Sequence, residues 1–261
     1  MRYFFLLVLV FIFSTNVKAQ RGVVESIPVQ FGQFFNTHSL INPASCGSAS
    51  HTELVFGTQR HAGVWKNIST SYASASLRVS PPQRSNFQVM GLSFVSDKEG
   101  EYLKRSRVYL TYAWHTQLTE HVSLSAGASG GFFSYSVSGS NSNISGSANA
   151  PDASVGLWLY TKKYYVGCSA NQILNSKLTP LEETTRLMMH YNLTGGYRYK
   201  ASPVLIVEPR ILIRYTKGRA LDVDVATLGI IQEIVGVGVN YRHRRNFVTM
   251  VSLERLKFRH G

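Results

Sequence analysis

The stretch from residue 189 to residue 200 decides the class of fold, and it reads Met189-His190-Tyr191-Asn192-Leu193-Thr194-Gly195-Gly196-Tyr197-Arg198-Tyr199-Lys200. Apolar and aromatic residues share one parity, namely Met189, Tyr191, Leu193, Tyr197 and Tyr199. Polar and charged residues share the other parity: His190, Asn192, Thr194, Arg198 and Lys200. Because successive side chains of a β-strand point to opposite faces, this alternation predicts a strand with one apolar and one hydrated face.

The same alternation recurs along the chain in segments near 52–59, 70–79, 87–96, 107–116, 121–135, 152–160, 164–171, 188–200, 204–215, 220–231, 234–242 and 247–257. Their lengths bracket the roughly 9–11 residues that a tilted strand needs to cross a bilayer. A soluble β-sandwich also alternates, but its strands are usually shorter. The pattern therefore favours an all-β fold, an antiparallel transmembrane β-barrel of about 12–14 strands.

Features between and at the ends of the segments fit this prediction. Aromatic residues near segment ends are typical of interfacial girdles, as at Trp114, Trp158, Tyr160, Tyr164 and Tyr199. Lys162-Lys163 and Gly218-Arg219 are expected to form tight turns on the periplasmic side. The Ser/Gly/Asn-rich stretch 136–150 and the long connection 174–186 are expected to be mobile extracellular loops.

The start of the chain predicts export. A basic Met1-Arg2 precedes the apolar run from Phe4 to Phe13, and small residues follow at Val17 and Ala19. This is the pattern of a signal peptide over residues 1–19, with cleavage between Ala19 and Gln20. Residues 20–261 are then expected to form one outer-membrane β-barrel domain, in which residues 20–50 do not alternate. No later segment has the ~18 consecutive apolar residues of a transmembrane helix.

The composition and the predicted export limit the classes of partner that the protein is expected to bind. The formal net charge is +13, and export makes nucleic acid an unlikely target for it. Anionic lipid or lipopolysaccharide headgroups, acidic protein surfaces and an anion-favouring lumen stay open, as do basic loops without a specific partner. The two cysteines, Cys46 and Cys168, are too few for a disulfide scaffold. A bridge between them is open in an oxidising compartment.

No group of residues predicts catalysis, a metal site or a cofactor. Asp222 and Asp224 could bind calcium or act as acid and base, but lumen charges balanced by arginines are the favoured interpretation. The arginines expected to balance them are Arg210, Arg214 and Arg242. The eight histidines show no metal-ligand spacing, and no glycine-rich nucleotide motif precedes a helix. The chain is not expected to be an enzyme.

The N-terminal segment carries a resemblance to a known family. Its Gln33-Phe34 and its Asn42-Pro43-Ala44-Ser45-Cys46-Gly47 resemble the opening signature of the PorP/SprF family of type IX secretion system membrane proteins. Further matches follow in the family's order at Arg60, Trp65, Asp152, Gly156, Tyr165, Gly167, Ser169, Gly196, Tyr197, Pro209, Tyr215 and Asp222. The chain departs from the family at Ser45-Cys46, where an aromatic residue is usual. Its C-terminus is also short, which leaves closure of the barrel by these strands open.

Physical roles for the opening signature follow from its residue types. Asn42-Pro43 fits a turn, because proline fixes its own φ and lacks a backbone donor. Gly47 suits a position with positive φ. The signature residues are expected to be structural, packing the N-terminal segment into or across the barrel. A direct contact with a partner is the alternative.

The resemblance implies a non-enzymatic outer-membrane barrel of a Gram-negative, Bacteroidota-type bacterium that supports secretion or surface attachment of cargo proteins, such as gliding adhesins. It implies outer-membrane lipids, type IX secretion components and the C-terminal domain of a cargo protein as partners. The stretches 136–150 and 174–186 are expected to hold that domain. The alternative is a small passive channel whose basic lumen prefers anions, with Arg198, Lys200, Arg210 and Arg214 facing inward. A secreted soluble β-adhesin is the third interpretation.

Overall fold

The computed structural model describes residues 24–26, 38–49, 52–60, 67–81, 86–138, 145–181, 184–232, 234–242 and 246–253. The predicted signal peptide lies outside these ranges, as do the signature residues Gln33, Phe34 and Trp65. Within the described ranges, no helix has both the length and the apolar character to cross a membrane.

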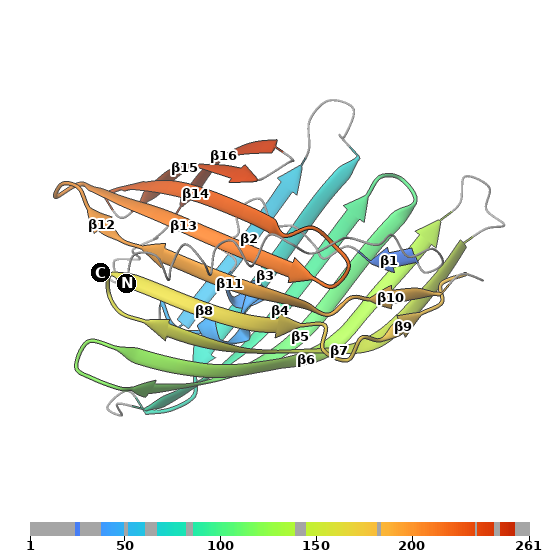
Figure 1. Cartoon of the computed structure of the whole chain (residues 1–261), viewed down its shortest axis with the longest axis horizontal. Helices are drawn as coiled ribbons and strands as arrows, with labels where there is room; N and C mark the ends of the chain where they lie inside the picture. Colours follow the sequence, from blue (N-terminus) through green and yellow to red (C-terminus); the bar gives the residue numbers. More distant parts are fainter. Residues whose placement is uncertain are drawn as a thin grey trace, which may run out of the picture.

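One antiparallel sheet makes up most of the molecule (Figure 1). Its strands follow the chain order: β2 (Thr52–Arg60), β3 (Ile68–Arg78), β4 (Phe87–Glu99), β5 (Leu103–Gln117), β6 (Ser123–Ser138), β7 (Ser145–Tyr160), β8 (Tyr164–Asn171), β11 (His190–Tyr197), β13 (Leu205–Thr216), β14 (Asp222–Ile231), β15 (Val235–Arg242) and β16 (Asn246–Leu253). Every predicted segment corresponds to one of these strands, so the all-β antiparallel prediction is confirmed. The short β12 (Tyr199–Lys200) pairs only with β13.

The predicted strand 188–200 is interrupted at one residue. The backbone N–H of Arg198 donates to the carbonyl of Lys163 at 2.6 Å, one step beyond the last β8–β11 pair. β11 ends at Tyr197, and β12 continues the pairing with β13 in the same register. The two edges of the sheet are β2 and β16, and no ladder joins them within the described residues.

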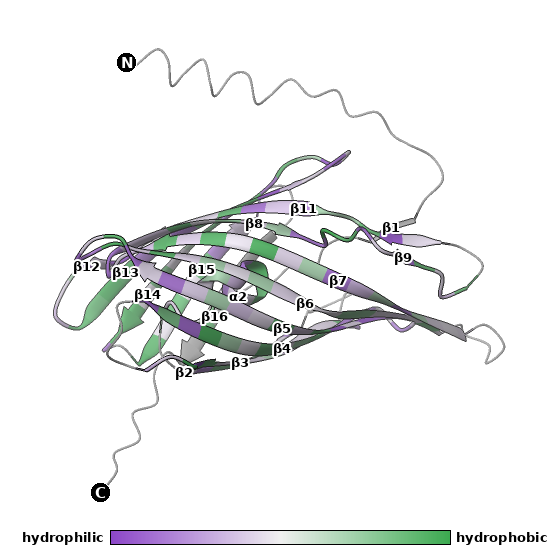
Figure 2. Cartoon of the chain, turned by 90° about the horizontal axis from the view of Figure 1, so that it is seen from below, coloured by the Kyte–Doolittle hydropathy of each residue, from purple (hydrophilic) through white to green (hydrophobic). Residues whose placement is uncertain are grey.

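The distribution of side chains between the two faces is inverted relative to a soluble protein. In β5, Arg105, Thr111 and His115 are buried, whereas Leu110 and Trp114 are exposed. In β11, His190, Asn192 and Thr194 are buried, whereas Tyr191, Leu193 and Tyr197 are exposed. Large apolar side chains are exposed at alternating positions in other strands as well, and the ribbon colours of several strands alternate accordingly (Figure 2). A polar interior inside an apolar belt is the arrangement of transmembrane β-barrels.

The girdle prediction holds for only part of its residues. Trp114, Tyr164 and Tyr199 are exposed on the outer face. Trp158 is 2% exposed, and Tyr160 bonds to the buried His115. These two were assigned to the wrong face, because the even-numbered residues of β7 point inward.

The strand ladders define two ends of the sheet. The connections 79–86, 118–122, 161–163, 198–204 and 232–234 lie at one end, called here the turn end. The connections 61–67, 100–102, 139–144, 172–189, 217–221 and 243–245 lie at the other, called here the rim end. Lys162-Lys163 and Gly218-Arg219 both form tight turns, but they lie at opposite ends. Their common assignment to the periplasmic side was therefore wrong.

Residues 136–138 and 145–150 are strand, so the prediction of a loop was wrong for them, and residues 139–144 lie outside the described residues. β6 continues to Ser138 and β7 starts at Ser145, with pairing out to Ser138 and Ser145. The ladder is made by backbone groups, so a Ser/Gly/Asn-rich composition does not prevent it. The two strands therefore form a hairpin that projects at the rim end.

The connection 174–186 is also ordered against this hairpin. It contains β9 (Lys177–Leu178) and the start of β10 (Thr185–Leu187), and β1 (Val24–Ser26) pairs with β10 in parallel. The Ser176 hydroxyl donates to the Pro151 carbonyl at 2.6 Å. A buried cluster joins both parts: Phe133, Tyr135, Ala150, Leu178 and Leu187. The rim, defined here as residues 133–138 of β6 and 145–151 of β7 with β1, β9 and β10, is held together by this cluster and by the ladders of β10 with β1 and β9.

Candidate functional site: the interior plug

Residues 38–49, called here the plug, lie inside the curved sheet (Figure 2). The plug consists of α2 (His38–Ile41), the 3₁₀ turn η1 (Pro43–Ser45) and the turn through Gly47. Asn42 caps η1 with an extended backbone, and its side-chain oxygen accepts from the Ala44 N–H at 3.0 Å. Pro43 at the first position of η1 loses no hydrogen bond there. Gly47 has a φ of +81°, as its residue type predicts.

Asn42 fastens the plug to the wall. Its amide nitrogen donates to the carbonyls of Leu157 and Cys168, each at 3.0 Å. These carbonyls belong to the neighbouring strands β7 and β8. With its oxygen bonded to Ala44, the amide is satisfied on both sides although Asn42 is 1% exposed. An aspartate here would have no donors for the two carbonyls.

Wall side chains bond the backbone of the plug in return. The Ser169 hydroxyl and the Asn171 amide donate to the Ile41 carbonyl at 2.9 and 3.0 Å. His115 Nε2 lies 2.8 Å from the Cys46 carbonyl oxygen and therefore acts as the donor. His115 Nδ1 lies 2.9 Å from the Tyr160 hydroxyl. Two strands, β8 and β5, thus hold the carbonyls on either side of η1.

Glycines let the plug backbone lie directly on the sheet. A Cβ at Gly127 would lie 2.6 Å from the nitrogen and Cα of Ala44. A Cβ at Gly156 would lie 2.0 Å from the Asn42 side-chain oxygen. Neither approach is open to a residue with a side chain. The floor, defined here as the inner face of β5–β8, is therefore shaped for the Asn42-Pro43-Ala44 turn.

Aromatic rings cover further inward glycines beside the plug. The Trp158 ring lies where a Cβ of Gly167 would be, at 2.0 Å, and the Tyr165 ring lies over Gly196 at 2.5 Å. The two rings stack with centroids 4.8 Å apart. His38 of the plug lies 5.3 Å from Trp158 and 4.9 Å from Tyr165. This ring cluster packs α2 against β7 and β8.

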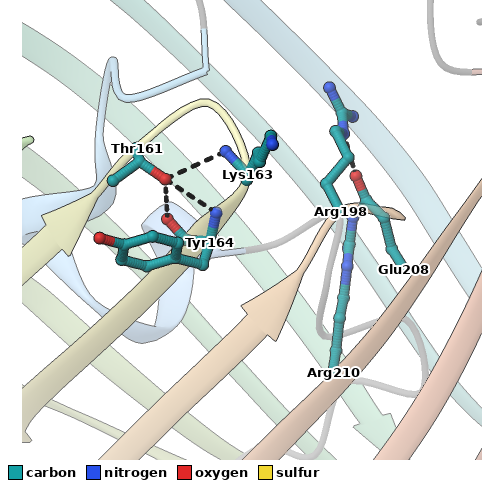
Figure 3. A network of polar contacts seen from close by, with 6 residues as sticks. All are labelled: Thr161, Lys163, Tyr164, Arg198, Glu208 and Arg210. Carbon is teal, nitrogen blue, oxygen red and sulfur yellow. Dashed lines mark hydrogen bonds and ion pairs between the residues drawn. The ribbon is translucent and has the colours of Figure 1, made fainter. Parts of the chain in front are cut away.

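Charges of the lumen wall are largely paired. Arg242 bonds Asp224 at 2.9 Å, as the sequence predicted for the acidic pair. Arg214 donates to the Asn192 side-chain oxygen at 3.1 Å. Glu208 lies between Arg198 and Arg210 and pairs with both (Figure 3). Arg105 pairs with Asp97 at 2.8 Å and also with Glu99.

A match with a known family fits this geometry. The family model described as "Type IX secretion system membrane protein PorP/SprF" matches residues 23–261. The chain belongs to the PorP/SprF family. That description is of a membrane component of a secretion system and not of an enzyme. No curated protein and no solved structure gives a significant match.

In this PorP/SprF protein, most of the described signature residues surround or form the plug. Asn42, Pro43, Ala44 and Gly47 form it, and the wall residues around it are Asp152, Gly156, Tyr165, Gly167, Ser169 and Gly196. Others lie elsewhere: Tyr197, Pro209 and Tyr215 are on the outer face, Asp222 begins β14, and Arg60 ends β2. Sequence reasoning missed His38, His115, Asn171 and Gly127. The inward parity of their strands is the signal that could have indicated His115, Asn171 and Gly127, whereas His38 lies in α2 and has no such signal.

A polar cavity of about 30 Å³ remains beside the plug. Arg107, Asp152, His190 and Arg214 are among its lining residues. Tyr109 donates to Asp152, whose other oxygen accepts from the Ala153 N–H at 2.7 Å. A space of this size holds about two water molecules. Within the described ranges, no group of three or more His, Cys, Asp or Glu side chains is placed to hold a metal ion.

Two of the residues assigned to a basic lumen share the inward face of Glu208 and Ile206 but lie at its open turn end. Lys200 is exposed, and the Arg198 side chain is 48% exposed at the turn end. Arg210 and Arg214 are buried inside, as predicted. Cys46 and Cys168 are both free thiols, the first buried in the plug and the second exposed on the outer face. They lie on opposite sides of the wall and form no bridge.

Proposed function

We propose that this PorP/SprF protein is a non-enzymatic outer-membrane barrel with a filled lumen. In this proposal it supports secretion or surface attachment of a cargo protein instead of conducting solutes. The observation that carries the proposal is the plug, which is hydrogen-bonded to the wall by Asn42, Ser169 and His115. The inverted faces of the sheet support the membrane location. Export by a signal peptide over residues 1–19 is part of the proposal.

Barrel closure also belongs to the proposal. Unpaired strand edges are costly in hydrocarbon, because no water satisfies their backbone groups. The edges β2 and β16 run in opposite directions, as antiparallel closure requires. A closed barrel migrates faster in unheated than in heated detergent gels. Identical migration in both conditions, with secondary structure intact in solution, would contradict closure.

The rim is the surface proposed to hold the C-terminal domain of the cargo. Short turns usually face the periplasm and longer connections the outside. In this proposal the hairpin, packed with β9 and β10 and paired to β1, lies on the extracellular side. A preformed surface loses less conformational entropy on binding than a mobile loop would.

Shortening the hairpin tests this role. Tyr135 and Ala148 are paired across β6 and β7, so replacing residues 136–147 by Asn-Gly keeps the ladder below them. The matched control replaces Gly218-Arg219, a tight turn at the same end, by Asn-Gly. We expect the hairpin variant to lose co-purification of the cargo domain from detergent-solubilised membranes and the control to keep it. Equal recovery with both variants would overturn the assignment of the rim.

The competing proposal is a passive anion channel. The observation that favours it is the cavity beside the plug, which Arg107 and Arg214 line. A steady conductance of the unmodified protein in planar bilayers would support the channel. The plugged barrel predicts no such conductance.

A further inference from the structure

The outer face of the sheet changes in chemical character toward the rim end. On both β4 and β5, an outward apolar side chain is followed by a hydroxyl and then by a cation at alternate positions. Taken toward the rim end, these residues are Phe94, Ser96 and Lys98 on β4 and Val108, Ser106 and Lys104 on β5. Phe94 and Val108 are exposed, and so are both lysines. The two cations therefore share one surface with the apolar belt.

The neighbouring strands change from apolar to polar at the same step of the ladder. In register with Phe94 and Val108, the outward residues of β3, β6 and β7 are Ala73, Phe132 and Pro151. Two positions further toward the rim end, they are Ser71, Ser134 and Asn149. Apolar side chains on the outside of a membrane barrel face hydrocarbon, whereas hydroxyl and amide groups are costly there. This step therefore marks the edge of the apolar belt on the rim side.

Lys98 and Lys104, called here the lysine pair, lie directly opposite each other in the β4–β5 ladder. Opposite residues of an antiparallel pair have Cβ atoms about 5 Å apart, and like charges in these positions repel each other. Both lysines lie two residues beyond the hydroxyls of Ser96 and Ser106, which is about 7 Å along the strand. Because lysine carries its charge on a flexible apolar stem, both ammonium groups can extend into the headgroup region.

The carboxylates near the lysine pair bond to other groups. Asp97 and Glu99 have the opposite parity on β4, and both pair with Arg105. Glu101 accepts a hydrogen bond from the Asn67 amide at 3.0 Å. No ion pair of either lysine is found in the part of the chain that the structure describes. An anion between the two ammonium groups would offset their repulsion.

We propose that the lysine pair binds the phosphate of an anionic membrane lipid. The acyl chains of this lipid would lie along the apolar side chains on the same face, among them Phe94, Val108 and Phe132. A lipid is favoured over a soluble anion because the lysines continue the outward face of these exposed apolar residues. The inference rests on the proposed membrane location but not on the role of the rim.

Fluorescence quenching of a tryptophan near the lysine pair tests the proposal. The variant Phe94→Trp places this reporter on the outward face of β4, and the protein without the substitution gives the background of the three native tryptophans. Each protein is reconstituted in phosphatidylcholine vesicles that contain increasing amounts of dibrominated phosphatidylglycerol or of dibrominated phosphatidylcholine. We expect phosphatidylglycerol to be preferred near the reporter by roughly fivefold, since each lysine near an anionic headgroup contributes attraction.

Three further variants carry the same reporter. Lys98→Ala/Lys104→Ala is expected to lower the preference for phosphatidylglycerol close to one. Lys98→Arg/Lys104→Arg keeps both charges and is expected to keep the preference. Lys162→Ala/Lys163→Ala removes the same charge from the β7–β8 turn at the other end of the sheet, and it is also expected to keep the preference. Heat-modifiable migration reports whether each variant is folded.

The outcomes distinguish this inference from the proposed function. Equal quenching by the two brominated lipids, or an unchanged preference in Lys98→Ala/Lys104→Ala, would overturn the inference and leave the membrane location in place. An equal loss of preference in Lys162→Ala/Lys163→Ala would show an effect of net charge and would overturn it too. Loss of the preference in millimolar inorganic phosphate at constant ionic strength would assign the pair to a soluble anion instead. Quenching by neither lipid would contradict the membrane location itself.

Discussion

The plug contacts two sides of the curved sheet, and the two contacts differ in kind. On the floor side, β5–β8 hold it through directional hydrogen bonds and glycine contacts, as at Asn42 and Gly127. On the opposite side, called here the apolar side, Ile41 of the plug joins a hydrophobic cluster with Tyr72, Val95, Ile206, Leu212, Ala226, Leu228 and Ile230. That cluster joins β3 and β4 to β13 and β14, which lie toward opposite edges of the sheet.

The two kinds of contact have separate consequences, one for the position of the plug and one for closure of the sheet. Hydrogen bonds with fixed geometry allow one placement of the plug on the floor. Hydrophobic contact is non-directional and tolerates rearrangement of similar volumes. We therefore expect the floor side to determine where the plug lies, and the apolar side to bring the edges of the sheet together.

The largest effect is expected when a bulky side chain is placed on the floor beneath the plug. Gly127→Leu would drive a side chain into the backbone of Ala44, so the plug cannot stay in place. We expect planar-bilayer conductance to appear in this variant. Gly130→Leu is the control, since a Cβ at Gly130 meets nothing within 4 Å. Silence in both variants, with both proteins folded, would show that the plug does not block the lumen.

The next largest effect is expected from removing the main hydrogen bonds between the plug and the floor. Asn42→Ala leaves the carbonyls of Leu157 and Cys168 without their side-chain donor. Each lost buried hydrogen bond costs about 1–3 kcal/mol, so the free energy of unfolding should fall by roughly 2–4 kcal/mol. Denaturant unfolding in detergent measures it. A loss below about 0.5 kcal/mol would show that the floor does not hold the plug through Asn42.

The reactivity of Cys46 reports the position of the plug. Burial raises the pKa of this thiol to about 11, so little thiolate is present at neutral pH. With a water-soluble maleimide at pH 7, we expect labelling about a hundredfold slower than for a thiol of ordinary pKa. Gly127→Leu should remove most of this protection. Cys168→Ala gives the background in which only Cys46 is measured.

The smallest effect is expected on the apolar side. Leu228→Met keeps the side-chain volume in a fully buried position, so the free energy of unfolding should change by less than about 1.5 kcal/mol. Conductance should stay absent. A larger loss than in Asn42→Ala would reverse the proposed division between the two sides.

Much of the fold could be predicted from the sequence, because a period of two is a local property. Tyr191 and Asn192 show their opposite faces in any strand. The hairpin beyond Tyr135 could not be recognised, since its pairing uses backbone groups and the side chains that cover its base are those of Leu178 and Leu187. Trp158 was placed on the wrong face for a related reason. An aromatic residue near a strand end can point outward into an interfacial girdle, but it can equally point inward and cover a glycine such as Gly167.

The sequence by itself determined the strands, their alternation, the turn at Asn42-Pro43 and the positive φ of Gly47, because each depends on neighbouring residues. Only the tertiary structure decided where the plug rests. Asn42 meets Leu157 and Cys168, and Ala44 meets Gly127, across more than eighty positions of chain. Such contacts depend on how the sheet curves and which small residues face inward at the same level, and no local pattern specifies either.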